Sequence, residues 1–208
     1  MFAFWDKPII HVSADLMIHR NMFWTLTFQN DEQVIRKMVE LHDELSEKLY
    51  NASSTFAISN MIQPVPTLFS NHSIDRGGNV LGLDRFKENL VCKSSGGDTL
   101  KLRSKIQSLT YVYSTVFQHW LTWDHADEDD MFESAGNSFI HELSEFAKKT
   151  GKDNEFIYLD YAYKTQDPLT SYGKENIDKI RAVAKKYDPD GVFQTMVPGG
   201  FKISDVHA

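Results

Sequence analysis

Residues 156–203 read FIYLDYAYKTQDPLTSYGKENIDKIRAVAKKYDPDGVFQTMVPGGFKI, and this stretch combines a strand signal, a helix signal and a glycine-containing tail. Its opening FIYLDYA is rich in aromatic and aliphatic residues of high β propensity, which predicts a core strand covered on both faces. Ser171 is placed to cap a following helix, and Pro189 prevents that helix from continuing. The predicted helix has one buried stripe, made of Ile177, Ile180, Val183, Ala184 and Tyr187. Glycines in the tail permit close backbone approach, so we expect the tail to lie flat against another surface.

Upstream of this stretch, strand and helix signals alternate along the chain. Residues 21–29 are rich in Phe, Trp and Thr and predict a strand, and residues 55–62 predict a second one. Between them, Asn30 with Gln33 three positions later is typical of a capping box, and an apolar stripe follows to Tyr50. The order of these elements favours an α+β fold in which a partial antiparallel sheet is covered by helices.

Two further segments complete the pattern. Residues 64–79 contain prolines and a Gly-Gly-Asn group, which predicts a long connection that could line a site. The acidic residues from Asp124 to Asp130, together with His125, could hold a cation, but their spacing lacks the glycine and distal glutamate of a calcium loop. We therefore predict a helix start here, because acidic side chains favour the positive end of the helix dipole, with the helix ending at Gly151.

Composition and charge exclude several classes of function. The 208 residues are 41% hydrophobic and 25% charged, which is sufficient for a sizeable core. A net charge of −7 argues against nonspecific nucleic-acid binding, which needs clustered Lys and Arg. The first ten residues predict neither a signal peptide nor a membrane span, and localisation stays undetermined. The eight histidines show no metal-ligand grouping and Cys92 has no base beside it, so we expect neither a metal site nor thiol catalysis.

Four pieces of the C-terminal stretch also resemble a known family. FIYLDYA, SYGKEN, KYDPDGVFQ and GGFK occur in this order. They are similar to the Tyr-x-Asn-Tyr-Ala strand, the Ser-Tyr-Gly-x-Asn helix start, the Lys-Tyr-Asp-Pro-x-Gly-Val-Phe-Gln turn and the Gly-Gly-Phe-Lys tail of fungal berberine bridge enzyme-like, FAD-linked oxidoreductases. The resemblance covers residues 20–91 and 119–203 and includes GGNVLGL at residues 77–83. It implies the later part of the substrate domain and the C-terminal return to the flavin domain.

The resemblance also implies a domain organisation and a cofactor. Family members carry FAD on an N-terminal domain, and this sequence shows neither a Gly-rich phosphate loop after a strand nor the covalent flavin-attachment motifs. We therefore expect a partial substrate domain at residues 20–151, a C-terminal berberine bridge-like segment at residues 152–208 and an unassigned N-terminus at residues 1–19. FAD is the implied cofactor, and we expect the chain alone to bind it poorly.

Residues 92–118 interrupt the resemblance. Their composition shifts to Ser, Gly and Lys before an apolar, β-like run from residue 109 to residue 117. Codon degeneracy allows Cys92-Lys93-Ser94 to encode a splice donor and Phe117-Gln118 to encode an acceptor, so the block could be translated intron sequence. The other interpretation is a lineage-specific hairpin insertion, and sequencing the transcript across this interval distinguishes the two.

The resemblance implies which residues face the flavin and the substrate. Tyr158, Asp160 and Tyr161 match positions that face the cofactor in relatives, and Tyr172 is assigned to cofactor binding as well. A tyrosine serves as general base in some members, so Tyr161 and Tyr158 are the candidate catalytic residues, with Tyr161 preferred. Asp160 replaces an Asn of the relatives, and an ionised carboxylate only accepts hydrogen bonds. Either this residue is no longer required for contact with the flavin, or the Asp160 carboxyl is held neutral by a raised pKa. The candidate substrate-binding residues are Gln63, Asn79 and Trp123.

Three hypotheses for function follow. The first is an FAD-linked oxidoreductase-like protein of fungal secondary metabolism that acts on a small molecule and lacks its N-terminal FAD-binding domain. The second is a flavin-free small-molecule binding or cyclase-type module, which needs a closed apolar pocket with a few polar groups. The third is one half of a split flavoenzyme, completed by a separate FAD-domain polypeptide that docks on the Tyr158 segment and the Gly199-Gly200-Phe201 tail.

Overall fold

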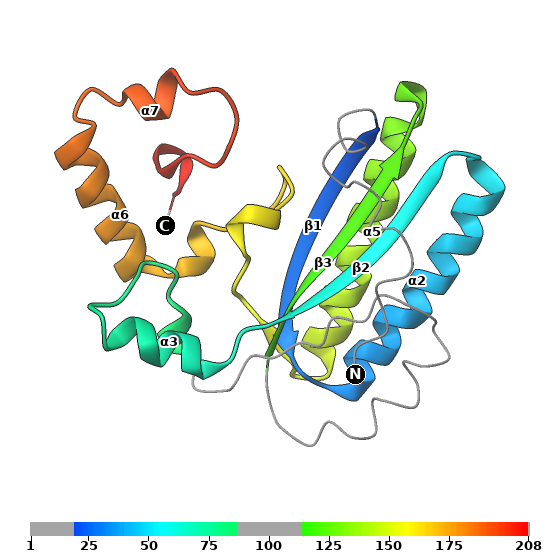
Figure 1. Ribbon diagram of the computed structural model, residues 1–208, viewed down its shortest axis with the longest axis horizontal. Helices are drawn as coiled ribbons and strands as arrows, with labels where there is room; N and C mark the ends of the chain where they lie inside the picture. Colours follow the sequence, from blue (N-terminus) through cyan, green and yellow to red (C-terminus); the bar gives the residue numbers. More distant parts are fainter. Residues whose placement is uncertain (1–18, 87–113, 208) are drawn as a thin grey trace, which may run out of the picture.

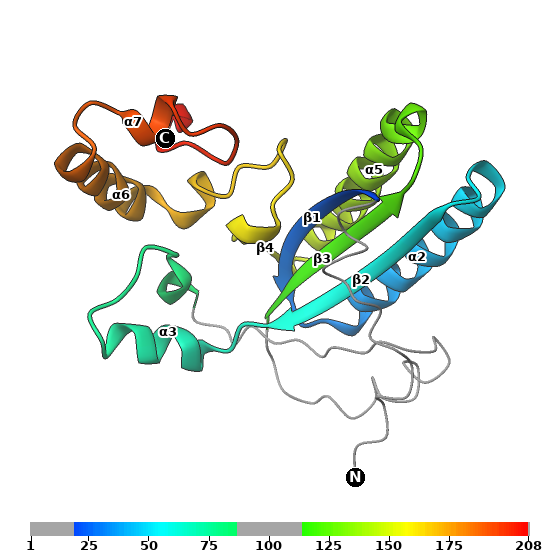
Figure 2. The ribbon, with the colours of Figure 1, turned by 45° about the horizontal axis from the view of Figure 1, so that its top comes forward.

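One antiparallel sheet organises the protein, whose computed structural model describes residues 19–86 and 114–207 (Figure 1). The spatial order of its strands is β2-β3-β1-β4. Their bounds are Arg20–Gln29 for β1, Phe56–Pro64 for β2, Ser114–Trp123 for β3 and Asp153–Asn154 for β4. Helices α2 (Glu32–Ala52) and α5 (Asp129–Lys149) lie side by side on one face of this sheet (Figure 2). The predicted α+β fold with a helix-covered antiparallel sheet is therefore confirmed.

The remaining helical segments gather beside the sheet rather than on it (Figure 1). They are α3 (Thr67–Ile74), α6 (Lys174–Tyr187) and α7 (Val192–Thr195), together with short 3-10 turns at Leu83–Arg85, Leu159–Tyr161, Thr170–Tyr172 and Ile203–Asp205. A further 3-10 turn at Ala126–Glu128 leads into α5, which begins at Asp129 as the acidic residues predicted. In the part of the chain that the structure describes, no helix is long and apolar enough to cross a membrane.

Helix α2 forms where the sequence predicted it, but its cap is a different residue. Asp31, in extended conformation, accepts hydrogen bonds from the backbone N–H groups of Gln33 and Val34 at 2.8 and 3.3 Å. The prediction of Asn30 as the cap was therefore wrong by one residue. The stripe that α2 buries is Val34, Ile35, Met38, Leu41 and Leu49.

Alternation along the strands separates the two faces of the sheet. On the helix-covered face, Phe28 and Phe117 pack into a core with α2 and α5, and Trp24 and Trp123 pack into a second cluster with Phe132. Side chains of a strand point alternately to opposite faces. The intervening residues of β1, β2 and β3 therefore lie on the face away from α2 and α5.

A separate apolar cluster joins the sheet to the C-terminal segments. Val116 of β3 packs with Phe156, Tyr172 and Ile177, and Ile203 completes the contact from the tail. Burial of such side chains stabilises the folded state by about 1.5–3 kcal/mol each. The C-terminal stretch is thus attached to the sheet by side-chain packing at one end of β3.

Three sequence predictions about the C-terminal stretch and the connection before it were wrong. Residues 156–162 form a loop and a 3-10 turn instead of a core strand, because side chains take up their backbone groups: Asn154 accepts from the Phe156 N–H at 2.9 Å and Ser171 accepts from the Ile157 N–H at 3.0 Å. The predicted connection at residues 64–79 contains α3. The cap position of α6 is Gly173, which leaves Ser171 outside the helix.

The stripe predicted for α6 is also narrower than expected. Ile177 is fully buried, whereas Val183 and Tyr187 are 56% and 70% exposed. Ile180 and Ala184 are partly buried against the cluster that contains Ile177 and Ile203. The buried face of α6 therefore extends to Ala184 but does not include Val183 or Tyr187.

Part of the block that interrupts the family resemblance, residues 92–118, belongs to the sheet. Residues 92–113 lie outside the described residues, but residues 114–118 form the first half of β3, which pairs with both β1 and β2. Phe117 and Gln118 are 0% and 4% exposed. The intron and the insertion interpretations both stay open for the block, and either must account for these strand residues.

Candidate functional site

The face of the sheet opposite α2 and α5 is the candidate functional site, and we call it the polar face. Cross-strand pairing sets its rows: Phe23 lies opposite Trp120, Thr25 opposite Gln118, and Thr27 opposite Val116. On the other side of β3, its residues Trp120, Gln118 and Val116 lie opposite Ser59, Met61 and Gln63 of β2, respectively. None of the side chains in these rows is titratable between pH 4 and pH 10, so the surface they form is neutral.

Buried polar atoms without a partner concentrate on this face. Among the described residues, Thr25 Oγ1, Thr27 Oγ1, Gln118 Nε2 and Trp120 Nε1 are shielded from solvent and make no hydrogen bond. Leaving such a group unsatisfied costs about 1–3 kcal/mol, and most buried polar groups in proteins are paired. Orphaned polar atoms of this kind call for an explanation, and their concentration marks this face as the candidate site.

The Tyr158–Tyr161 turn is fastened to the edge of this face by Gln166. The Gln166 side chain accepts a hydrogen bond from the Thr25 N–H at 3.1 Å and donates one to the Thr25 carbonyl at 2.6 Å. The same Oε1 atom accepts from the Tyr163 N–H at 2.9 Å. Gln166 therefore substitutes for a neighbouring strand where β4 has ended, and it holds the turn against β1.

The predicted flavin-side residues are brought together in this turn. The rings of Tyr158 and Tyr161 meet edge to face at 5.2 Å. The Tyr158 hydroxyl donates a hydrogen bond to Asp160, which raises the pKa of Tyr158, and partial burial raises it further. Asp160 itself is exposed. Tyr158 is thus held protonated in this conformation, which suits a hydrogen-bond donor better than a base.

Tyr172 supports the turn from behind. It is 4% exposed, and its ring stacks on Phe156 at 5.8 Å. Burial raises the pKa of the Tyr172 phenol, while a hydrogen bond from the backbone of Leu159 opposes this shift. Its oxygen therefore accepts from the Leu159 N–H, and Tyr172 positions the turn rather than presenting its hydroxyl to a ligand.

The predicted substrate-binding residues do not converge. Gln63 lies on the polar face opposite Val116. Asn79 is exposed, bonds Ser73 at 2.8 Å and helps to line a separate hollow of about 370 Å³ beside the start of α6. Trp123 lies on the helix-covered face, is 1% exposed and stacks on Phe132 at 4.5 Å. Of these residues, Gln63 alone is placed to contact a ligand on the polar face.

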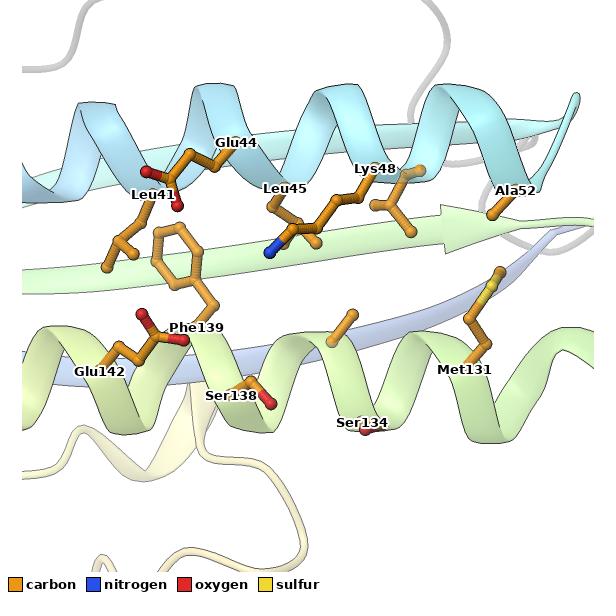
Figure 3. Close-up of a pocket in the computed structure, with 12 residues that line it drawn as sticks. Leu41, Glu44, Leu45, Lys48, Ala52, Met131, Ser134, Ser138, Phe139 and Glu142 are labelled. Carbon is orange, nitrogen blue, oxygen red and sulfur yellow. The ribbon is translucent and has the colours of Figure 1, made fainter.

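A second hollow lies in the helix layer, on the other side of the sheet from the polar face. Figure 3 shows this groove of about 290 Å³ between α2 and α5. Leu41, Leu45 and Phe139 line it, and Glu44, Lys48 and Glu142 stand at its sides. The sheet separates the groove from the polar face and from the Tyr158–Tyr161 turn.

Two of the acidic residues around the start of α5 have partners that the structure shows. Asp129 pairs with Arg20 and accepts from Trp123 Nε1 at 2.9 Å. The hydrogen bond from Arg20 is the main reason why the pKa of Asp129 is lowered. Glu128 accepts from Ser53 at 3.1 Å. Within the described ranges no group of three or more His, Cys, Asp or Glu side chains is arranged to hold a metal ion.

The described residues fit the ring of FAD better than its pyrophosphate. The flavin ring is flat and aromatic, which matches the aromatic turn formed by Tyr158 and Tyr161. A pyrophosphate requires backbone N–H groups of a Gly-rich turn at a helix start. Of the described segments between a strand and the next helix, residues 30–31, 65–66 and 124–128 contain no glycine, and the segment before α6 contains one, Gly173, at the helix start. The fold and the site together define an α+β module in which the aromatic Tyr158–Tyr161 turn lies against strand β1 of the sheet.

Comparisons with known proteins specify the family to which this module is similar. The chain is 37% identical to an FAD-dependent monooxygenase of Aspergillus calidoustus over 189 residues, 90% of this chain and 31% of that protein. It is 38% identical to an FAD-dependent monooxygenase of Emericella nidulans over 187 residues, 89% of this chain and 34% of that protein. A third, from Cochliobolus heterostrophus, is 31% identical over 89% of this chain and 32% of its own length.

These similarities support an FAD-linked oxidoreductase family, with FAD as the cofactor of the family. The chain spans about a third of the length of the curated relatives it matches. No family model matches the chain. No solved structure matches it either.

Sequence reasoning missed the residues that build the polar face. Thr25 and Thr27 alternate with Trp24, Leu26 and Phe28, and this alternation is the signal in the sequence that could have identified a polar stripe on β1. Gln118 fell inside the block that interrupts the family resemblance. Gln166 carries no local signal, because its role depends on the edge of a strand about 140 residues earlier in the chain.

Proposed function

We propose that this chain forms the substrate side of an FAD-linked oxidoreductase of the berberine bridge enzyme-like branch, acting on a small molecule of fungal secondary metabolism. The observation that carries the proposal is the set of buried, unpaired donors on the polar face, next to the aromatic Tyr158–Tyr161 turn. The similarity to FAD-dependent monooxygenases supports it, as do the four C-terminal motifs. In this proposal, residues 20–151 belong to the substrate domain and residues 152–208 form the return segment.

The residues of the turn have separate roles in this proposal. A bound flavin supplies a hydride acceptor that molecular oxygen reoxidises. Tyr161 accepts the substrate proton as its phenolate, since Tyr158 is the tyrosine held protonated by its hydrogen bond to Asp160. Tyr158 and Asp160 fix the position of Tyr161, and Gln63 and Gln118 hold the substrate on the polar face. Asp160 thereby serves as an acceptor for Tyr158, a role that its carboxylate can fill and that does not require contact with the flavin.

An exposed apolar surface supports contact with an FAD-binding domain, and the split-enzyme arrangement is a second candidate that uses this contact. Several large apolar side chains of α6, α7 and the following loop are 45–75% exposed: Val183, Tyr187, Val192, Phe193, Met196 and Val197. Large apolar side chains exposed on neighbouring segments are typical of contact sites. In this form of the proposal, a separate FAD-domain polypeptide covers the surface and supplies the pyrophosphate site.

Comparison of FAD with lumiflavin, its ring without the ribityl and nucleotide parts, tests the proposal. We expect the purified chain to be colourless and to bind both compounds weakly, with dissociation constants within about threefold of each other, because it contacts only the ring. Quenching of flavin fluorescence during titration measures both constants. The proposal fails if neither compound quenches, and the ring-only contact fails if FAD binds stoichiometrically and far more tightly than lumiflavin.

A further inference from the structure

Arg85 joins its own loop to the segments on both sides of the Tyr158–Tyr161 turn. Its Nε–H donates to the Gly82 carbonyl at 3.1 Å, within the loop. Its Nη1 donates to Glu155 Oε1 at 2.6 Å, and its Nη2 donates to the Ser171 carbonyl at 2.6 Å. Glu155 precedes the turn in the chain and Ser171 follows it. One guanidinium group therefore bridges the chain before the turn and the chain after it.

The backbone around Arg85 leaves room for the guanidinium at two glycines. A Cβ atom at Gly82 would lie 2.9 Å from Arg85 Nε, and a Cβ atom at Gly173 would lie 2.7 Å from Arg85 Nη1. Both glycines have positive φ angles, 69° and 85°, which residues with side chains rarely adopt. The guanidinium is therefore enclosed by backbone, and its planar fork of donors suits acceptors that lie in different directions.

The residues that Arg85 holds also hold the backbone of the turn. Ser171 Oγ accepts a hydrogen bond from the Ile157 N–H at 3.0 Å. The next residue, Tyr172, accepts one from the backbone of Leu159. Two backbone groups at the start of the turn are thus bonded to side chains whose own segment is fixed by the contact between Arg85 and the Ser171 carbonyl.

The two outward contacts of Arg85 differ in strength. The side chains of Arg85 and Glu155 are 35% and 62% exposed, so solvent screens their ion pair, and exposed pairs contribute little. Ser171 is 8% exposed, and a hydrogen bond from a charged donor to a buried carbonyl is stronger. The bond to Ser171 is therefore the contact on which the position of the turn mainly depends.

We propose that Arg85 is a positioning residue of the candidate site, because its bond to the Ser171 carbonyl holds the Tyr158–Tyr161 turn in the conformation in which Tyr158 bonds Asp160. Arg85 acts through Ser171 and Glu155 and does not itself contact a ligand. The proposal rests on the proposed function, since that function assigns flavin contact and the proton acceptor to this turn.

The pKa of Tyr158 separates positioning from a simple effect of charge, because the two have opposite signs. Removing a cation that acts through its charge alone destabilises the phenolate, and so raises the pKa of Tyr158. Loosening the turn instead removes the hydrogen bond to Asp160 and part of the burial, both of which raise the pKa of Tyr158 in the intact chain. We therefore expect Arg85→Met to lower the pKa of Tyr158 toward its ordinary value of about 10.

NMR titration of the full chain with ¹³C-labelled tyrosine rings measures this pKa, with the Tyr158 signal assigned from Tyr158→Phe. We expect Arg85→Lys to lower the pKa as Arg85→Met does, because an ammonium keeps the charge but lacks the planar fork. Glu155→Gln should have a smaller effect. Arg36→Met removes an exposed arginine of α2 that pairs with Glu32, and this matched control should leave the pKa of Tyr158 unchanged.

Lumiflavin titration of the same variants gives a second measurement. We expect Arg85→Met to weaken lumiflavin binding about threefold to tenfold, because a loosened turn must be ordered when the ring binds. Arg36→Met should bind lumiflavin as the wild type does. If lumiflavin binds to none of these proteins while both Arg85 variants lower the pKa of Tyr158, the proposed function fails and the positioning role stands.

Three results would overturn the positioning role. One is a pKa of Tyr158 that rises in Arg85→Met and is unchanged in Arg85→Lys, which shows an effect of charge alone. Another is a pKa that both variants leave unchanged, and with normal lumiflavin binding this result leaves the proposed function intact. The third is an equal fall in the pKa of Tyr163, whose ring contacts Trp24, because it shows general loosening. If Arg85→Met does not fold, Arg85→Lys decides between the same outcomes.

Discussion

Lowering the pH from 6.5 to 4 is expected to reduce the free energy of unfolding by roughly 3 kcal/mol through His119 alone. His119 is 0% exposed, and burial lowers its pKa to about 3, with the nearby His42 adding to the shift. In the unfolded chain the side chain titrates near its ordinary pKa of about 6.5. Between these values the unfolded state binds a proton that the folded state excludes, so stability present above pH 6.5 is lost as the pH falls.

Geometry explains why His119 stays neutral. Its Nδ1–H donates to Asn60 Oδ1 at 2.7 Å, and Asn60 Nδ2 donates to His42 Nδ1 at 3.0 Å. The ring also stacks on Phe139 at 4.2 Å with an interplanar angle of 2°. Its Nε2 atom, an acceptor in this tautomer, has no partner among the described residues. An added proton on Nε2 would thus place an unpaired charge in the core, which is strongly unfavourable.

Urea denaturation at several pH values measures this effect. The His119→Asn side chain keeps a donor for Asn60 but does not titrate. We therefore expect this variant to have a lower free energy of unfolding and to lose the part of that free energy that falls with pH. His125→Asn, a change at an exposed position, is the matched control and should retain the wild-type pH slope. Identical pH slopes for the wild type and His119→Asn would contradict the account of His119.

Gly136→Ala is expected to lower the free energy of unfolding by about 2 kcal/mol, although alanine is the better helix former. A Cβ atom at Gly136 would overlap three ring carbons of Trp24. Trp24 cannot retreat easily, because it is 1% exposed, donates to Asn137 at 2.9 Å and contacts the Tyr163 ring at 4.6 Å. The gain in helix propensity is up to about 1 kcal/mol and is outweighed by the overlap.

Denaturation of three variants separates the cost of steric overlap with Trp24 from the gain in helix propensity. Ser134→Ala on an exposed position of the same helix is the matched control and should be neutral or slightly stabilising. In a double-mutant cycle, Trp24→Phe should relieve part of the cost of Gly136→Ala, since a smaller ring leaves room for the methyl group. A neutral or stabilising Gly136→Ala variant would show that α5 does not approach β1 as closely as described.

The fold was predictable from the sequence to the extent that its elements depend on local pattern. The alternation in residues 21–29 and the periodic stripe of α2 predicted β1 and the helix that covers it. Residues 156–162 were misread because aromatic β-formers also suit an irregular segment when side chains such as Asn154 and Ser171 satisfy its backbone. Propensity describes the residue alone, whereas this outcome depends on side-chain partners 2 and 14 positions away.

The candidate site was predictable only in part, and for a related reason. The motif around Tyr158, Asp160 and Tyr161 identified one half of it from contiguous residues. The other half depends on the register between β1 and β3, which places Thr25 opposite Gln118 across a gap of more than ninety residues. No local pattern encodes that pairing, so the polar face became visible only in three dimensions.

A crystal structure of the chain with lumiflavin tests the central claim most directly, namely that the polar face and the Tyr158–Tyr161 turn form one site. We predict electron density for the ring in contact with Tyr161 and bordering the polar face near Thr25 and Gln118. Density in the groove between α2 and α5, or at any place away from the turn, would contradict the account.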